Sequence, residues 1–137
     1  MTPHTAEHPL AGEEFVSLTT FRRIGQPVSS PVWIAPSPSV SNLLLVTTLD
    51  GSGKVKRLAH TERVELRACD RRGRVAEDAP TYHGTGRVVR DSASVEALLT
   101  AVRGKYAIYR VLGPVQAMLN RLRSGAPRVG IQITMAG

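Results

Sequence analysis

The segment from Thr47 to Leu58 gathers hydroxyl groups, glycines and three cations within twelve residues. It follows the apolar run from Leu43 to Val46 and precedes residues that can begin a helix. Glycines let the backbone approach a phosphate closely, and free amide groups at a helix N-terminus point toward an anion. The order of strand, glycine loop and cationic helix start therefore predicts an anion site.

The glycine spacing narrows the kind of anion site that this segment can form. Only Ser52 separates Gly51 from Gly53, and Val55 follows the lysine, so the spacing disfavours the phosphate-binding loop of P-loop nucleotidases. A polar turn beside a solvated basic helix is an alternative that the pattern leaves open.

The composition predicts one globular domain with a basic surface. The chain has 137 residues, of which 42% are hydrophobic and 21% charged, with a net charge of +7. Between Gly53 and Arg90 there are ten Lys or Arg residues against five Asp or Glu. Such a surface attracts phosphates, polyglutamates or nucleic acid. Because only three Tyr, two Phe and one Trp are present, a stacking platform for nucleic acid is disfavoured.

The cysteine and hydropathy patterns bear on location. Cys69 is the only cysteine, so an internal disulfide is excluded, and no apolar run approaches the ~20 residues of a membrane span. The N-terminus lacks the pattern of a secretory signal. We expect a cytoplasmic protein without a membrane span.

Strands dominate the first two thirds of the chain. The first 14 residues form an N-terminal segment with at most a short helix over Ala6 to Glu14, and the domain is expected to cover residues 15–137. Alternation and turn residues predict a hairpin and three further strands: Phe15–Phe21, Val28–Ala35, Leu43–Thr48, Val64–Cys69 and Tyr82–Val89. Close backbone approaches are expected at the glycines of the last of these, Gly84 and Gly86.

Helical patterns follow these five strands. Lys54 to His60 is expected to form a short helix over the sheet. After Asp91 and Ser92, apolar residues recur on one helical stripe: Val95, Leu98, Leu99, Val102 and Tyr106. A second helix is expected to open at Gly113-Pro114, and Val129–Met135 closes the chain as a strand. Short strands with late helices predict a mainly β fold, a small β-barrel with α-helices against it.

Several segments together resemble the split-barrel flavin and deazaflavin oxidoreductases, in particular the coenzyme F-420-dependent members of the pyridoxamine-phosphate-oxidase-like superfamily. The segments that carry the resemblance are Phe15–Arg23, Gly25–Trp33, Ser52–Leu58, Arg63–Leu66, Arg103–Tyr106 and Val129–Thr134. The resemblance implies a homodimer of FMN-binding-protein-like split barrels with the cofactor in a groove between subunits. It also implies an oxidoreductase that transfers a hydride between F-420 and a small conjugated organic substrate.

The same resemblance assigns the cofactor-binding residues. The ring would lie along one strand, at Ser30, Pro31, Val32 and Trp33. The phosphate would be held by the loop and helix start, at Thr47, Thr48, Ser52, Gly53, Lys54, Lys56 and Arg57. Pro31 lacks an N–H group, so it is expected at an edge or bulge of the sheet, where an ordinary edge proline is the alternative.

This sequence departs from the oxidase branch of the superfamily at two cofactor positions. The strand arginine of that branch is replaced by Ser30 or Ser29, and Gly53 stands where the branch has a second cation. Both departures favour the deazaflavin branch, with FMN or FAD as the alternative cofactor. Family members also place Asn-Pro where this chain has Thr61-Glu62, so the turn there is expected to differ.

The sequence assigns no catalytic side chain. Histidine side chains can transfer protons near neutral pH, so His60 and His83 are candidate proton donors, but surface or phosphate-proximal positions are the simpler interpretation. Four scattered histidines and one cysteine show no metal-ligand spacing, so no metal is expected. Arg22, Arg23, Arg71, Arg72 and Arg74 sit in expected turns, where they are solvated or contact an anionic cofactor tail. A non-catalytic deazaflavin carrier is a further alternative.

Overall fold

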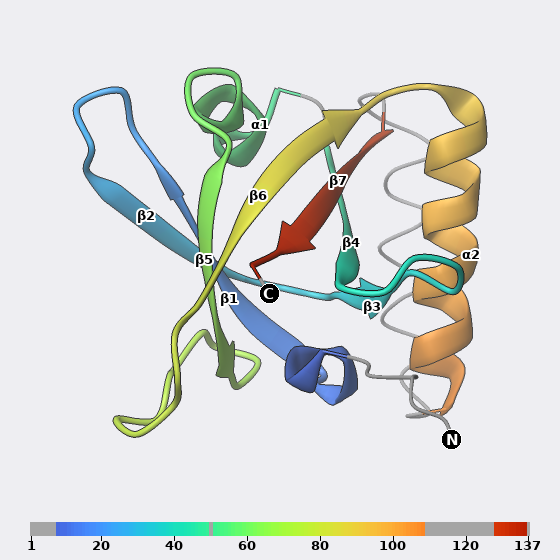
Figure 1. Ribbon diagram of the computed structural model, residues 1–137, viewed down its shortest axis with the longest axis horizontal. Helices are drawn as coiled ribbons and strands as arrows, with labels where there is room; N and C mark the ends of the chain where they lie inside the picture. The colour runs from blue at the N-terminus through green and yellow to red at the C-terminus, as the bar shows by residue number, and fades with distance from the viewer. Residues whose placement is uncertain (1–7, 50, 109–127, 137) are drawn as a thin grey trace.

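The computed structural model of the chain describes residues 8–49, 51–108 and 128–136 (Figure 1). Its elements are a 3-10 helix at Pro9–Gly12, the strands β1 (Phe15–Phe21), β2 (Pro27–Val32), β3 (Ala35–Pro36), β4 (Leu43–Leu49), β5 (Arg63–Cys69), β6 (Tyr82–Val89) and β7 (Arg128–Met135), and the helices α1 (Gly53–Leu58) and α2 (Ser92–Ile108).

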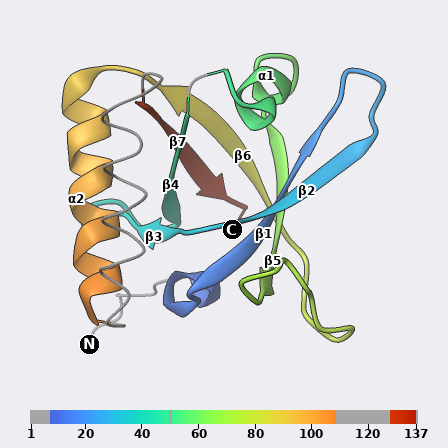
Figure 2. The same cartoon turned by 180° about the vertical axis from the view of Figure 1, so that it is seen from behind.

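All seven strands form one curled sheet. Its order is β2-β1-β5-β6-β7-β4-β3, and every neighbouring pair is antiparallel. The two strands at the ends of this order, β2 and β3, are consecutive in the chain, with only Trp33 and Ile34 between them. Figure 2 shows the chain passing directly from β2 into β3 beside α2. The sheet therefore curls into a split β-barrel, which confirms the predicted fold class.

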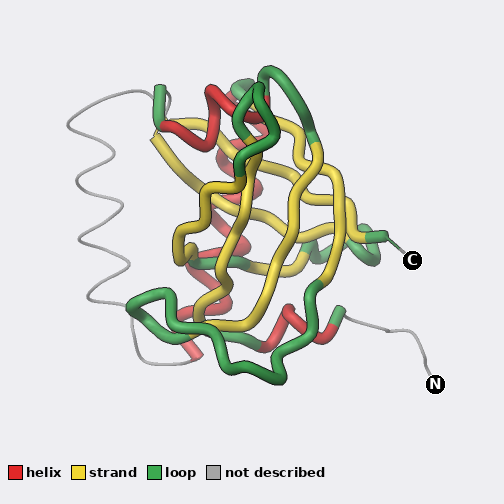
Figure 3. The backbone as a smooth tube through the Cα atoms, turned by 90° about the vertical axis from the view of Figure 1, so that its left-hand side faces the viewer, coloured by secondary structure: helices red, strands yellow, loops and turns green. Residues whose placement is uncertain are grey.

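The core has two parts, one on each side of β4. Leu44 and Val46 point into the barrel, where they join a cluster that includes Leu10 of the 3-10 helix. Leu45 alternates to the outer face and packs with the apolar stripe of α2. The short helices α1 and Pro9–Gly12 lie at opposite ends of the barrel (Figures 1 and 3).

Most element predictions agree with the structure. The ranges of β1 and β6 are as predicted, and the hairpin turn between β1 and β2 is closed by a hydrogen bond that the Arg22 amide donates to the Gln26 carbonyl. The predicted stripe of α2 is buried at Val95, Leu98, Leu99 and Val102. The side chain of Tyr106 and the helix predicted at Gly113-Pro114 lie outside the described part.

The prediction of a single strand over Val28–Ala35 is wrong. The chain leaves the ladder after Val32 and pairs again at Ala35, but with β4 at the opposite edge of the sheet. Local alternation continues through this segment, whereas the change of partner depends on how the barrel curls. As a result six strands, not the expected five, precede α2.

Two residues of the N-terminal segment are buried in the barrel. Leu10 is 2% exposed and Ala11 is 4% exposed. The predicted division between residues 1–14 and 15–137 stays a prediction. Among the described helices, none has the length and apolar character that crossing a bilayer requires.

The tight packing of β6 gives a test of the fold. A Cβ atom at Gly84 would lie 2.8 Å from the backbone oxygen of Thr134, which agrees with the close approach predicted there. Gly84→Ala should therefore lower the free energy of unfolding by about 1 to 3 kcal/mol. Gly104→Ala is the control, because its Cβ would meet nothing within 4 Å and alanine favours a helix. Denaturant unfolding of both variants checks this, and equal stabilities would contradict it.

Candidate functional site

The loop after β4 is held by hydroxyl hydrogen bonds. Gly51 has a φ of 83°, which a side chain would disfavour. The Ser52 hydroxyl caps α1, since it accepts a hydrogen bond from the Val55 amide at 3.5 Å. The Thr48 hydroxyl donates to Ser52 Oγ at 3.4 Å. Strand, loop and helix start are thus joined, and α1 begins at Gly53, one residue earlier than predicted.

Lys54 connects this corner to strand β2. Its Nζ donates a hydrogen bond to Ser30 Oγ at 3.4 Å. Burial lowers the pKa of Lys54, and the neighbouring Arg57 guanidinium lowers it further. Ser29, the other candidate for the missing strand arginine, contacts Thr19 instead, with its hydroxyl 2.6 Å from Thr19 Oγ1. Ser30 is therefore the serine that faces α1.

Arg57 is fixed by a buried acceptor. Its Nε donates to Thr20 Oγ1 at 2.6 Å, and Thr20 is fully buried. The guanidinium lies over the start of the helix, because a Cβ atom at Gly53 would come within 2.7 Å of Arg57 Nη1. The absence of a side chain at Gly53 thus leaves room for the arginine. Burial and the charge of Arg22 both lower the pKa of Arg57.

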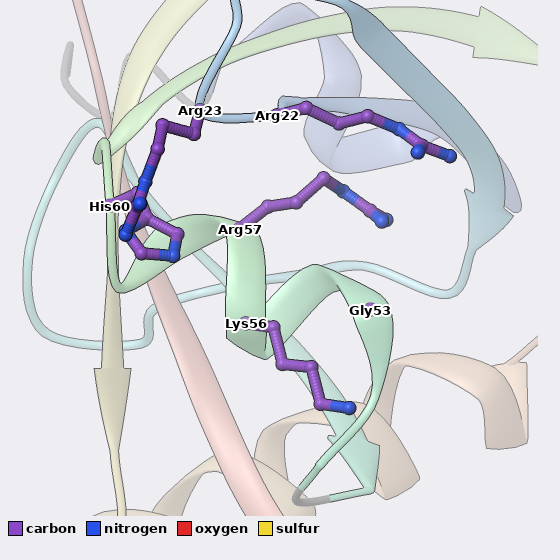
Figure 4. A pocket seen from close by; sticks show the side chains of 6 residues that line it. All are labelled: Arg22, Arg23, Gly53, Lys56, Arg57 and His60. Carbon is purple, nitrogen blue, oxygen red and sulfur yellow. The ribbon is translucent and has the colours of Figure 1, made fainter.

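A hollow of about 320 Å³ opens between α1 and the β1–β2 turn. Figure 4 shows the side chains of Arg22 and Arg57 extending in the same direction, with Arg23 beside His60. Arg23 Nη2 lies 3.5 Å from His60 Nδ1. The lining residues are Arg22, Arg23, Gly53, Lys56, Arg57 and His60. Four of these six carry a permanent positive charge at neutral pH.

No carboxylate of the described residues neutralises this cluster. The two ion pairs within residues 8–49, 51–108 and 128–136 both use Glu65, with Arg63 and His83 as partners. In addition, the hydroxyl of Thr47 is buried and has no hydrogen-bond partner among the described residues. Charge repulsion at such a corner is relieved by a bound anion.

The structure divides the predicted site residues into two groups along β2. The α1 group comprises Ser30, Thr48, Ser52, Gly53, Lys54, Lys56 and Arg57, which are linked by the contacts above or line the hollow. Val32 ends β2, and Trp33 follows it in the link to β3, so both lie beyond Ser30 in the direction of that link. Thr47 lies on β4, paired in register with Gly130.

The exposure of the predicted ring strand varies from residue to residue. Pro31 is exposed on β2, an end strand of the sheet order, as the edge prediction required. A Cβ atom at Gly73 of the β5–β6 loop would lie 3.3 Å from Pro31 Cδ. The side chain of Val32 is buried in the barrel, so only its main chain can face a ligand. Trp33 is half-buried and packs against the α2 side of the core.

The remaining candidate side chains lie at varied positions. His60 is exposed at the hollow, and His83 is exposed 3.7 Å from Glu65 Oε2. Burial, followed by the charges of Asp70 and Glu13, raises the pKa of the half-buried Cys69. Within the described ranges, no group of three or more metal-ligating side chains comes together.

Sequence reasoning missed the role of Thr20. It lies on the same face of β1 as Val16 and Leu18, both of which are fully buried. A hydroxyl on an apolar face needs a partner, so this alternation was a usable signal. The identity of the partner, Arg57, was not in the sequence pattern, because the two residues are 37 positions apart.

The lowered pKa of Lys54 predicts a pH dependence of phosphate binding. Inorganic pyrophosphate should favour the protonated amine, so its affinity should fall as pH rises through the lowered pKa of Lys54, below the range in which an ordinary lysine loses its charge. Lys54→Arg keeps its charge there and should show a shallower fall by calorimetric titration. Folding stability should change with pH in the opposite direction to binding. Because the pKa of Lys54 is lower in the folded state than in the unfolded state, the free energy of unfolding should rise as pH rises between these two pKa values. Identical slopes for both proteins would contradict this assignment.

The chain is similar in structure to proteins of several kinds. A conserved hypothetical protein of Mycobacterium tuberculosis matches with a TM-score of 0.68 and 17% identity, covering 100% of this chain and 82% of that one. The heme storage protein of Vibrio cholerae gives 0.64 and 12%, covering 91% and 83%. A protein described as an F-420 reductase gives 0.58 and 18%, covering 99% and 97%. At these identities the likeness shows the fold alone.

The sequence comparison identifies the family. No curated protein matches the sequence. The family profile described as pyridoxamine 5'-phosphate oxidase matches residues 2–135, nearly the whole chain. The chain therefore belongs to the pyridoxamine 5'-phosphate oxidase family of split β-barrels.

Proposed function

We propose that this protein is a homodimeric F-420-dependent oxidoreductase that transfers a hydride between the deazaflavin and a small conjugated organic substrate. The observation that carries the proposal is the cationic corner at α1, which the described carboxylates leave without an ion pair. Lys54 joins this corner to β2 through Ser30. A cofactor with a phosphate at one end and a flat ring at the other matches this arrangement. The F-420 reductase among the structural neighbours supports the choice.

The residues at the corner fit a phosphate. Lys54, Lys56 and Arg57 supply positive charge, and Thr47, Thr48 and Ser52 supply hydroxyl groups. Arg57 is held in place by Thr20 before any ligand arrives, so little side-chain entropy is lost on binding. The Thr47 hydroxyl is buried on the face of β4 opposite to that of Thr48, so its place among these residues rests on the family resemblance. These are the residues that would hold the phosphate.

The strand β2 fits the edge of a planar ring. It pairs with β1 on one side only, so the main-chain groups of its other side are unpaired among the described residues. Pro31 has no N–H group and so interrupts the row of donors. Val32, whose side chain is buried, could contact the ring only through its main-chain groups. These free groups suit the carbonyl and N–H edge of a deazaflavin. When bound, F-420 supplies a hydride from its ring, and the protein supplies binding, orientation and exclusion of water.

Two alternatives share this fold and this corner. The first is FMN or FAD as cofactor, since its phosphate would use the same cations; a yellow preparation with a flavin absorption band would favour it. The second is a non-catalytic deazaflavin carrier. That alternative needs no proton donor, and the two candidate donors each lie beside another charged group, His60 near Arg23 and His83 near Glu65. Storage is also the role named for the neighbour from Vibrio cholerae.

Fluorescence polarisation with F-420 tests cofactor binding directly. Lys54→Ala should lose about 1.5 to 3 kcal/mol of binding free energy, roughly 10- to 150-fold in Kd, because one charge-assisted contact to phosphate is removed. Arg103→Ala is the matched control, since Arg103 is an exposed cation of α2 and should leave the affinity unchanged.

Absence of F-420 binding by the unsubstituted protein would defeat the proposal. Equal affinities of Lys54→Ala and the unsubstituted protein would remove Lys54 from the site.

Turnover is tested separately, by oxidation of reduced F-420 with quinones, enones and tetrapyrroles. Binding without turnover on any of them would favour the carrier.

A further inference from the structure

A lysine of α2 reaches the point where the barrel curls. Lys105 Nζ donates hydrogen bonds to the backbone oxygen of Ile34 at 2.5 Å and to that of Glu13 at 2.6 Å. Ile34 belongs to the two-residue link between β2 and β3, and Glu13 lies between the 3-10 helix and β1. One half-buried ammonium group thus ties three segments that are distant in sequence.

The same face of α2 also packs against this link. Val102 precedes Lys105 by three positions, so both side chains lie on one helical face. Val102 is fully buried in a cluster that includes Ala35, with Trp33 packed against it. The Trp33 ring also contacts Phe15 of β1, with ring centroids 6.1 Å apart. The link is therefore held by apolar contacts through its side chains and by Lys105 through its backbone.

A charge-assisted hydrogen bond to a carbonyl has a directional effect that packing lacks. Apolar contacts tolerate small shifts, whereas the ammonium group fixes the orientation of the Ile34 carbonyl. We expect that orientation to carry back to the end of β2, at Val32, where the chain leaves the edge strand. The main-chain groups of this strand are those that the proposed function assigns to the ring.

We propose that Lys105 is a positioning residue, which orients the β2–β3 link so that the main-chain groups at the adjoining end of β2 meet the cofactor ring. This inference rests on the proposed function and adds a residue outside the phosphate corner. Because Lys105 lies by the link and the phosphate would bind at α1, its loss should weaken contacts with the ring and leave phosphate binding unchanged.

The chain provides its own probe of the link. Trp33 is the only tryptophan in the sequence, so fluorescence excited at a wavelength that tyrosine does not absorb reports on this position alone. The test variant is Lys105→Met, which keeps an unbranched apolar stem without the ammonium group. Lys105→Arg retains the charge, and Arg103→Met changes an exposed cation two residues away. Gly84→Ala is the comparator for a general loss of stability, since Gly84 lies on β6, away from the link.

In ligand-free Lys105→Met we expect a shifted Trp33 emission, with Lys105→Arg restoring it at least in part. The Kd for F-420 should rise by at least about fivefold, with altered induced circular dichroism of the ring, since two charged hydrogen bonds are lost. The Kd for inorganic pyrophosphate should stay within about twofold of the unsubstituted protein. Gly84→Ala and Arg103→Met should leave the emission and ring signals unchanged.

The proposal is overturned if ligand-free Lys105→Met has unchanged Trp33 emission, or if its affinities for F-420 and pyrophosphate fall equally. Changes of the same kind in Gly84→Ala would also overturn it, because they would reflect lost stability. If Lys105→Met fails to fold, Lys105→Gln is measured in its place, with the same outcomes deciding. If the unsubstituted protein bound no F-420, the proposed function would fail, whereas the Trp33 emission would still decide whether Lys105 orients the link.

Discussion

Repulsion among neighbouring cations is the constraint on which the functional account of this barrel depends. Arg57 is held by the buried Thr20. Burial lowers the pKa values of both Lys54 and Arg57, and a neighbouring charge lowers each further, that of Arg57 for Lys54 and that of Arg22 for Arg57. Such an arrangement costs folding free energy, which a bound anion would recover. This cost, kept at one corner beside an edge strand, is the basis for proposing an anionic ligand there.

The position of that corner depends on how the sheet closes into a barrel. β2 and β3 are opposite ends of the sheet order, but two residues join them. Because of this closure, the edge strand begins near α1 and ends near α2. We therefore expect the phosphate to bind near one end of β2. At the other end, Lys105 is expected to control the orientation of the strand.

The sequence pattern was sufficient to predict local secondary structure and the polar loop after β4. It was insufficient to predict which strands pair with one another. The ranges of β1 and β6 followed from alternation, and the buried stripe of α2 followed from its period. The break at Trp33 could not be predicted in this way, because the alternation of apolar and polar residues continues through a segment that changes its partner strand. The contacts of Arg57 with Thr20 and of Lys105 with Ile34 join residues far apart in the chain, which propensity and spacing do not encode. The cofactor assignments themselves remain predictions.

The most direct measurement compares F-420 with its phosphate-free deazaflavin core in calorimetric titrations of the same protein. The ring is common to both ligands, so the difference in affinity isolates the phosphate-bearing side chain. The account predicts that F-420 binds at least about tenfold more tightly, a difference of about 1.4 kcal/mol or more. Equal affinities would contradict it, because the cationic corner would then contribute nothing to binding.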